Sequence, residues 1–248
     1  MRKIFSSFIT ALTFATVIPV PSRLIPEWNE RSLKYFCPML PVIGIVLGIF
    51  WLTFLKLMPK FSPELSGFVM TVLTLALTGG LHLDGLMDTC DAVFSHRDRE
   101  TKLEILSDTH AGSFAVIGCV VIILAKTLTF AELFRLGADA LAVSAIPIFS
   151  RLGMAVLLNN LTFAKNDGLA RTLGEARSSS NNFIFAIITI ALLFLSEPAI
   201  LGTFVFCLAA HVIICLRIFG GITGDLLGAF AETSEAIMLL GMVIELCT

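Results

Sequence analysis

Seven runs of apolar residues dominate this 248-residue chain and limit the folds that it can adopt. They occupy residues 39–57, 65–83, 114–134, 140–158, 183–195, 201–216 and 226–246. A helix needs about 20 apolar residues to cross a bilayer, and inside lipid every backbone N–H and C=O must find a partner within the protein. We therefore predict an all-α, polytopic integral membrane bundle of about seven transmembrane helices. The mean hydropathy of +0.92 supports this prediction.

The first apolar segment, residues 4–20, differs from the seven runs because prolines interrupt its end. We interpret it as an interfacial or re-entrant anchor that the mature protein retains. The run 183–195 is short, which allows it to pair with its successor as a tight helical hairpin. We find no internal repeat and no linker, so residues 1–248 are predicted to form a single membrane-embedded domain.

The distribution of Lys and Arg predicts the orientation of the chain. If residues 1–36 lie in the cytoplasm and seven spans follow, most basic residues fall on the cytoplasmic side, as the positive-inside rule requires. The net charge of −2 says little about partners, but the sequence has no basic stripe of the kind that would indicate a nucleic-acid partner. The six cysteines show neither zinc spacing nor a disulfide framework.

Three aspartates and a histidine stand at the end of the second run. Asp84, Asp88 and Asp91 are spaced by four and then three residues, so a helix places all three carboxylates on one face, beside His82. Three carboxylates on one face repel each other and lose hydration near hydrocarbon, so they need a bound cation or protonation to be stable there. Mg²⁺, which accepts a few carboxylates together with substrate phosphate oxygens, meets that need. The alternative is a solvated helix face beyond the membrane.

A polar segment, residues 95–108, follows the aspartates on the cytoplasmic side. We expect a short surface helix whose Arg97, Arg99 and Lys102 reach substrate phosphates. The alternative is a solvated loop whose positive charge only determines topology. Asp108 stands where the chain re-enters the membrane, and it is placed to complete a metal site from the opposite side.

The last loop, residues 217–229, is rich in glycine. Backbone N–H groups around Thr223 and Gly224, together with the N-terminus of the following helix, are predicted to hold phosphate. Acids on one face of that helix follow, namely Asp225, Glu232 and Glu235. Acidic side chains inside a membrane are energetically costly, so they usually mark a functional site. Arg151, in another apolar run, is predicted to pair with one of these acids or to bind a phosphate.

The chain resembles the cobalamin synthase family, the adenosylcobinamide-GDP ribazoletransferases, in three motifs. The first is Gly-Gly-x-His-x-Asp-Gly-Leu-x-Asp-x-x-Asp at residues 79–91. The second is the acidic and basic segment that closes at Asp108. The third is Gly-Gly-x-Thr-Gly-Asp-x-Leu-Gly-Ala at residues 220–229, with acids downstream. The similarity extends from about residue 10 to residue 240.

The resemblance implies the last assembly step of the cobalamin nucleotide loop. A ribose hydroxyl of α-ribazole, or of its 5′-phosphate, attacks the cobinamide-bound phosphorus of adenosylcobinamide-GDP and releases GMP, with Mg²⁺ as cofactor. The implied metal ligands are Asp84, Asp88, Asp91, Asp108, Asp225, Glu232 and Glu235. The implied catalytic residues are His82, Asp84, Asp88 and Asp91, and which of the carboxylates or His82 is the general base stays open. The implied substrate-binding residues are Arg97, Arg99, Lys102, Arg151, Thr223 and Gly224.

The same resemblance implies the partners and the location. The substrates are a corrinoid nucleotide and α-ribazole, and the helices contact the lipid bilayer. A homo-oligomer and other corrinoid-assembly enzymes are further candidate partners. We expect a bacterial cytoplasmic (inner) membrane, with the N-terminus and the active site facing the cytoplasm.

Two alternative functions fit parts of the pattern. A CDP-alcohol phosphotransferase also uses clustered aspartates to join an alcohol to phosphorus, but residues 84–89 lack the Ala-Arg pair of that motif. A cation-coupled transporter would bind its driving ion at intramembrane acids. Against a transporter, the acids crowd toward one side of the membrane and the chain shows no repeated halves.

Overall fold

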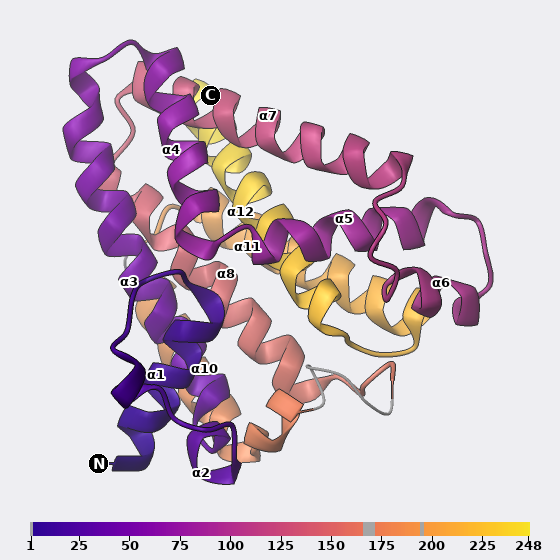
Figure 1. The fold of residues 1–248 in the computed structure, drawn as a ribbon. Helices are drawn as coiled ribbons and strands as arrows, with labels where there is room; N and C mark the ends of the chain where they lie inside the picture. The colour runs from indigo at the N-terminus through magenta and orange to yellow at the C-terminus, as the bar shows by residue number, and fades with distance from the viewer. Residues whose placement is uncertain (1, 166–171, 194–195) are drawn as a thin grey trace.

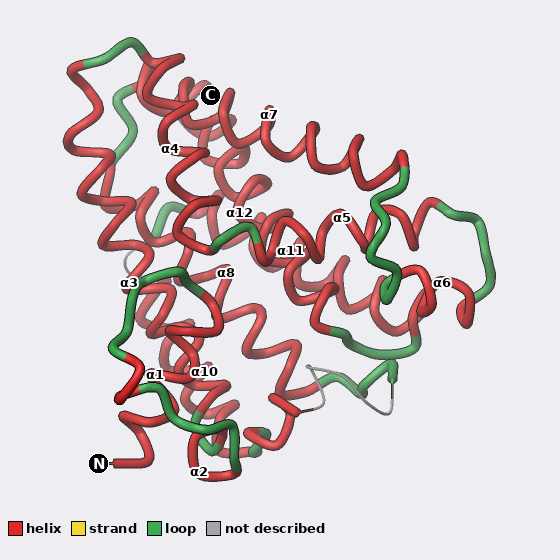
Figure 2. The backbone as a smooth tube through the Cα atoms, viewed as in Figure 1, coloured by secondary structure: helices red, strands yellow, loops and turns green. Residues whose placement is uncertain are grey.

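The computed structural model describes residues 2–165, 172–193 and 196–248 (Figures 1 and 2). The longer helices are α1 (Arg2–Ala15), α3 (Phe36–Leu57), α4 (Pro63–Thr78), α5 (Leu81–Phe94), α7 (Ser113–Leu136), α8 (Ala140–Asn160), α10 (Ser179–Leu193), α11 (Pro198–Ile214) and α12 (Gly224–Cys247). The shorter ones are η1 (Ser22–Leu24), α2 (Glu30–Leu33), η2 (Met58–Lys60), α6 (Arg99–Ile105), η3 (Gly174–Ala176) and η4 (Cys215–Phe219). The described ranges contain no β-strand, and Figure 2 shows helices joined by loops, so the all-α prediction is confirmed.

Five helices are long and apolar enough to cross a membrane: α3, α7, α8, α12, and α11 continued through η4. The pair α4 and α5 meets the same criteria only jointly, with a bend of 93°. The described residues thus supply five spans, or six with the bent pair, against about seven predicted. The run 183–195 accounts for part of the difference because α10 is shorter than a bilayer requires, and residues 194 and 195 lie outside the described ranges.

The packing of α10 also differs from the prediction. Its main neighbours in the described part of the chain are α8 and α3 rather than α11, so the predicted tight hairpin with α11 is wrong. The polytopic helical bundle itself is confirmed.

Two consecutive glycines break the predicted run 65–83. Gly79 and Gly80 have left-handed φ values of 63° and 74°, which glycine adopts without the steric cost of a Cβ. α4 ends there, and α5 turns away by 93°. His82 and the aspartates that follow it therefore stand on a helix of their own, which crosses the bundle instead of extending α4 (Figure 1).

Small residues let α3 and α8 pack closely. A Cβ on Gly44 would lie 2.7 Å from the Cα of Ile148, and one on Gly48 would lie 2.5 Å from the carbonyl oxygen of Ser144. Close backbone approach of this kind favours helix association in lipid. Lipid tails are themselves apolar, so apolar side chains gain little by exchanging lipid contacts for protein contacts. α8 and α12 are the most buried of the spanning helices, so most of their polar side chains face protein.

The N-terminal helix α1 has 14 residues, too few to cross a bilayer. It packs against α2 and α3, and the helix ends at Ala15 instead of extending through the predicted segment 4–20. Backbone N–H of Val17 then donates to the carbonyl oxygen of Leu77 at 2.9 Å, which holds the chain beside the bend. The interfacial or re-entrant placement of this segment stays a prediction.

Candidate active site

Two glycines bring the N-terminal parts of α5 and α12 together. A Cβ on Gly85 would lie 2.8 Å from the carbonyl oxygen of Asp225, and one on Gly228 would lie 3.0 Å from the carbonyl oxygen of His82. A larger residue at Gly85 would push against backbone, which cannot yield as a flexible side chain does. The crossing places the first motif against the third, so Asp84 and Asp225 share one site.

The glycine loop before α12 is held by the loop that follows α8. Backbone hydrogen bonds of 2.7 and 3.1 Å join Ile222 to Thr162 and Ala164. A Cβ on Gly221 would lie 2.5 Å from the backbone nitrogen of Ala164, so this contact requires glycine. The Thr223 hydroxyl then accepts a hydrogen bond from the first turn of α12. The predicted phosphate loop is therefore held by backbone contacts and leads into the N-terminus of α12.

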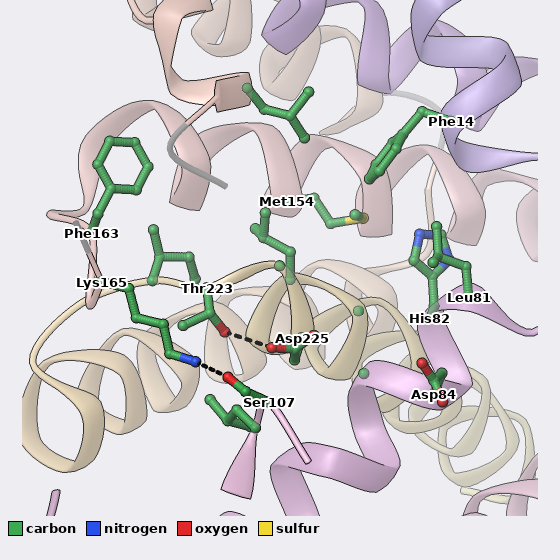
Figure 3. A pocket seen from close by; sticks show the side chains of 17 residues that line it. Phe14, Leu81, His82, Asp84, Ser107, Met154, Phe163, Lys165, Thr223 and Asp225 are labelled. Carbon is green, nitrogen blue, oxygen red and sulfur yellow. Dashed lines mark hydrogen bonds between the residues drawn. The ribbon is translucent and has the colours of Figure 1, made fainter. Parts of the chain in front are cut away.

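A cavity of about 250 Å³ lies where α5, α12 and these loops meet (Figure 3). In Figure 3 one side of it is polar and carries Ser107, Lys165, Thr223 and Asp225, with the Lys165 ammonium donating to the Ser107 hydroxyl. The other side is mostly apolar and carries Phe14, Leu81, His82 and Met154. Asp84 lies below His82 on α5. The cavity thus joins a charged region to an apolar one.

Acidic side chains from the predicted metal site gather near this cavity. Asp88 lies within electrostatic range of four other carboxylates, those of Asp84, Asp91, Asp108 and Asp225. The carboxylates of Asp84 and Asp88 have no hydrogen-bond or ion-pair partner in the described ranges. No three His, Cys, Asp or Glu side chains of those ranges lie close enough to hold a metal ion by themselves. The fold brings the acids into one region without building a closed coordination shell.

Asp91 has a partner that its spacing does not indicate. Its two carboxylate oxygens accept hydrogen bonds from the backbone N–H groups of Gly112 and Ala115, at 2.6 and 2.9 Å. These N–H groups belong to the start of α7 and have no partner inside that helix. Asp91 therefore caps α7 from a distant part of the chain, with its negative charge at the positive end of the helix. A metal-binding role for Asp91 stays a prediction.

Asp108 lies in the connection between α6 and α7 and pairs with His110. It accepts a hydrogen bond from the backbone N–H of His110 at 3.0 Å and contacts Nδ1 of the same residue at 2.7 Å. These hydrogen bonds lower the pKa of the Asp108 carboxyl. Asp108 is therefore an exposed, ionised carboxylate within electrostatic range of Asp88.

The three predicted phosphate-binding side chains of the polar segment have different positions. The Lys102 ammonium donates to the carbonyl oxygen of Val93 at 3.3 Å and so satisfies the C-terminal turn of α5. The Arg99 guanidinium lies against Gly220, where an added Cβ would be 2.1 Å from its Cζ. Arg97 is exposed. Of the three, Arg99 is the one that reaches the glycine loop.

The acids farther along α12 are neutralised inside the bundle. The Lys126 ammonium of α7 donates to Glu232 at 2.6 Å and to Glu235 at 2.7 Å, and the Arg151 guanidinium of α8 also donates to Glu235. The side chains of these four residues are between 1% and 4% exposed to solvent. Two buried cations therefore balance two buried acids. The predicted pairing of Arg151 with an acid is confirmed. These contacts engage Glu232 and Glu235, which we predicted to bind metal, and Arg151, for which phosphate binding was the alternative prediction.

Arg151 connects this buried cluster to the cavity. Its Nη2 lies 3.3 Å from Nδ1 of His82, which is 2% exposed. Phe14 and Lys165 also line the cavity, although no motif includes either residue. For Lys126 the sequence does hold a signal, because a lone lysine in an apolar run is costly unless it is paired.

Comparisons with known proteins agree with the motifs. The family model described as Cobalamin-5-phosphate synthase matches residues 7–243. The chain belongs to this family. A relative named adenosylcobinamide-GDP ribazoletransferase from Desulfitobacterium hafniense (strain Y51) is 35% identical, covering 97% of this chain and 96% of the relative.

Relatives with the same name from Geobacillus sp. (strain WCH70) and Geobacillus kaustophilus (strain HTA426) are 32% and 31% identical. The alignments cover 95% and 96% of this chain, and 94% and 95% of the relatives. No solved structure matches the chain. The family membership predicted from the motifs is confirmed, and elements carrying all three motifs meet around the cavity.

Proposed function

We propose that this chain is an adenosylcobinamide-GDP ribazoletransferase, the activity for which its relatives are named. In this reaction a ribose hydroxyl of α-ribazole, or of its 5′-phosphate, attacks the cobinamide-bound phosphorus of adenosylcobinamide-GDP. The new P–O bond joins the ribose to the cobinamide phosphate, the pyrophosphate bond breaks, and GMP leaves with the electron pair. The product is adenosylcobalamin or its 5′-phosphate.

The meeting of three distant motifs around one cavity carries this proposal. α5 supplies the unpaired carboxylates of Asp84 and Asp88, the glycine loop supplies the N-terminus of α12, and α6 places Arg99 against Gly220. Transfer at a pyrophosphate depends mainly on positioning the reactants and neutralising the phosphate oxygens. Backbone N–H groups and a guanidinium bind phosphate oxygens directly, while carboxylates serve through a bound cation.

The alternatives have less support. A CDP-alcohol phosphotransferase would use related chemistry, but the chain belongs to a different family. A cation-coupled transporter would also be a protein of another family, and the buried acids on α12 are not free to bind a driving ion. In this protein the buried Glu232 and Glu235 are already paired with Lys126 and Arg151.

The residues beside the cavity fit Mg²⁺ as a cofactor that the substrate helps to bind. Mg²⁺ commonly uses one or two carboxylates and completes its shell with water and substrate phosphate oxygens. Asp84 and Asp88 supply two carboxylates without partners among the residues that the structure describes, one helical turn apart. These two residues would hold the ion, which supplies positive charge to the pyrophosphate oxygens when bound.

The attacking hydroxyl must give up its proton within the cavity. His82 has no free acceptor at Nδ1, because the Arg151 guanidinium donates there. Asp225 lines the cavity, interacts electrostatically with Asp84, and accepts a long side-chain hydrogen bond from the Thr223 hydroxyl at 3.4 Å. We therefore assign Asp225 as the general base that takes the proton from the ribose hydroxyl.

For location, we propose the bacterial inner membrane, with the active site at the cytoplasmic face of this multi-pass protein. In Figure 1 the C-terminus and the α3–α4 turn lie at one end of the bundle, while the N-terminus and α2 lie at the other. With a cytoplasmic N-terminus, the polar segment and the loop after α8 add their basic residues to the cytoplasmic side, as the positive-inside rule favours.

Release of GMP by the detergent-purified protein tests the proposed activity. We expect GMP only when adenosylcobinamide-GDP, α-ribazole and Mg²⁺ are all present, and we expect Asp84→Asn and Asp88→Asn to abolish its release. Asp139→Asn is the matched control, because Asp139 caps α8 and asparagine caps a helix about as well. A folded wild-type protein that releases no GMP, or that releases it without α-ribazole, would contradict the proposal.

A further inference from the structure

The structure assigns the apolar side of the cavity to the aromatic base of ribazole. There the Nε2–H of His82 donates a hydrogen bond to the unsubstituted ring nitrogen of that base. This inference rests on the function proposed above and adds the residue that recognises one substrate.

The protonation of His82 follows from its neighbour. An arginine guanidinium has only donors, so the 3.3 Å contact between Arg151 Nη2 and His82 Nδ1 requires Nδ1 to be the acceptor. A neutral imidazole that accepts at one nitrogen carries its proton on the other. His82 is therefore a hydrogen-bond donor at Nε2, and Arg151 is the positioning residue that holds this tautomer.

The Nε2–H group has no partner in the described part of the chain. It is buried, and no hydrogen-bond acceptor of the described residues meets it. Buried donors without a partner are uncommon in native proteins because their lost hydration is not replaced. Since His82 lines the cavity, a ligand that brings an acceptor to this point removes the cost. The orphaned donor is thus an independent sign of a bound group.

The surroundings of His82 specify the kind of ligand. The imidazole projects from α5 toward Phe14 and Met154, with Leu81 beside it (Figure 3). The Phe14 ring is itself held in place by an edge contact with Phe36, with ring centroids 5.5 Å apart. A rigid aromatic ring and an adaptable methionine form a surface for a flat apolar group. A single donor in that surface selects a flat ring with a single acceptor.

The benzimidazole base of ribazole has this chemistry. One ring nitrogen is bonded to the ribose, the other is a free acceptor, and the rest of the bicyclic ring is apolar. A cavity of about 250 Å³ is large enough to hold a bicyclic ring. With the base against His82, the attached ribose extends toward Asp84 and Asp225, where the proposed chemistry takes place.

Binding of two matched ligands to the full-length protein in detergent tests this inference by calorimetry. The ligands are α-ribazole and its indole analogue, in which a C–H replaces the acceptor nitrogen without changing the ring shape. We expect wild type to bind α-ribazole on the order of tenfold more tightly, because the analogue leaves the His82 donor unpaired. In His82→Phe the two dissociation constants become equal. Met70→Leu, at a buried methionine of α4 that does not line the cavity, retains the tenfold preference.

Binding of the indole analogue shows in each variant that the cavity is folded. If His82→Phe binds neither ligand, the two dissociation constants are compared in the smaller variant His82→Ala, where they are also expected to be equal. Equal affinities in wild type, or a preference that persists without His82, would overturn the inference. GMP release is measured separately. Turnover without the ligand preference refutes the role of His82 alone, whereas the preference without turnover refutes the proposed function alone.

Discussion

Replacing Lys126 by Met removes one cation from the buried cluster. In the native protein Lys126 and Arg151 balance Glu232 and Glu235, and all four side chains are almost inaccessible to solvent. In Lys126→Met, Arg151 still contacts Glu235, but Glu232 loses its ionic partner. An uncompensated negative charge is left in the protein interior, while the methionine fills most of the space of the lysine stem.

Breaking a buried ion pair by removing one partner costs about 3–5 kcal/mol of folding free energy. For a protein of this size, 1 kcal/mol shifts the unfolding midpoint by about 2–4 °C, so we expect Lys126→Met to unfold on the order of 10 °C below wild type. Adding Glu232→Gln removes the unpaired charge. The double variant should recover most of the loss.

Thermal unfolding of detergent-purified protein, followed by tryptophan fluorescence, measures these midpoints. Lys56→Met is the control, because Lys56 is an exposed lysine at the end of a helix and should leave the midpoint unchanged. A midpoint of Lys126→Met equal to that of wild type would refute the reasoning. So would a double variant no more stable than the single one, since the penalty would then not come from the unpaired charge.

Two further predictions concern the contacts that build the site. Gly85→Val should reduce GMP release at least about tenfold, because its side chain would separate α5 from α12 and displace Asp84 from Asp225. Gly202→Val, at a helical position with open space around it, should leave turnover unchanged, and equal losses in both variants would speak against the crossing. Asp91→Ala should lower the unfolding midpoint by a few degrees through loss of the α7 cap, worth about 1 kcal/mol. Unchanged stability with lost Mg²⁺-dependent release would instead make Asp91 a metal ligand.

Much of the architecture follows from the sequence alone. Apolar runs near the length of a bilayer span require backbone hydrogen bonds within the chain, so they become helices whatever their neighbours are. The motifs at residues 79–91 and 220–229 contain enough specific residues to identify the family. Spacing also placed Asp84, Asp88 and Asp91 on one helix, which α5 confirms.

The tertiary structure decided which partner each polar side chain has. Spacing along a helix determines the face on which a side chain lies, but the element packed against that face comes from elsewhere in the chain. Asp91 therefore caps α7 and Glu235 pairs with Lys126 and Arg151, although both share helix faces with other predicted ligands. Buried charges and helix ends must find partners wherever packing brings them, and only the packed bundle shows which carboxylates are left free.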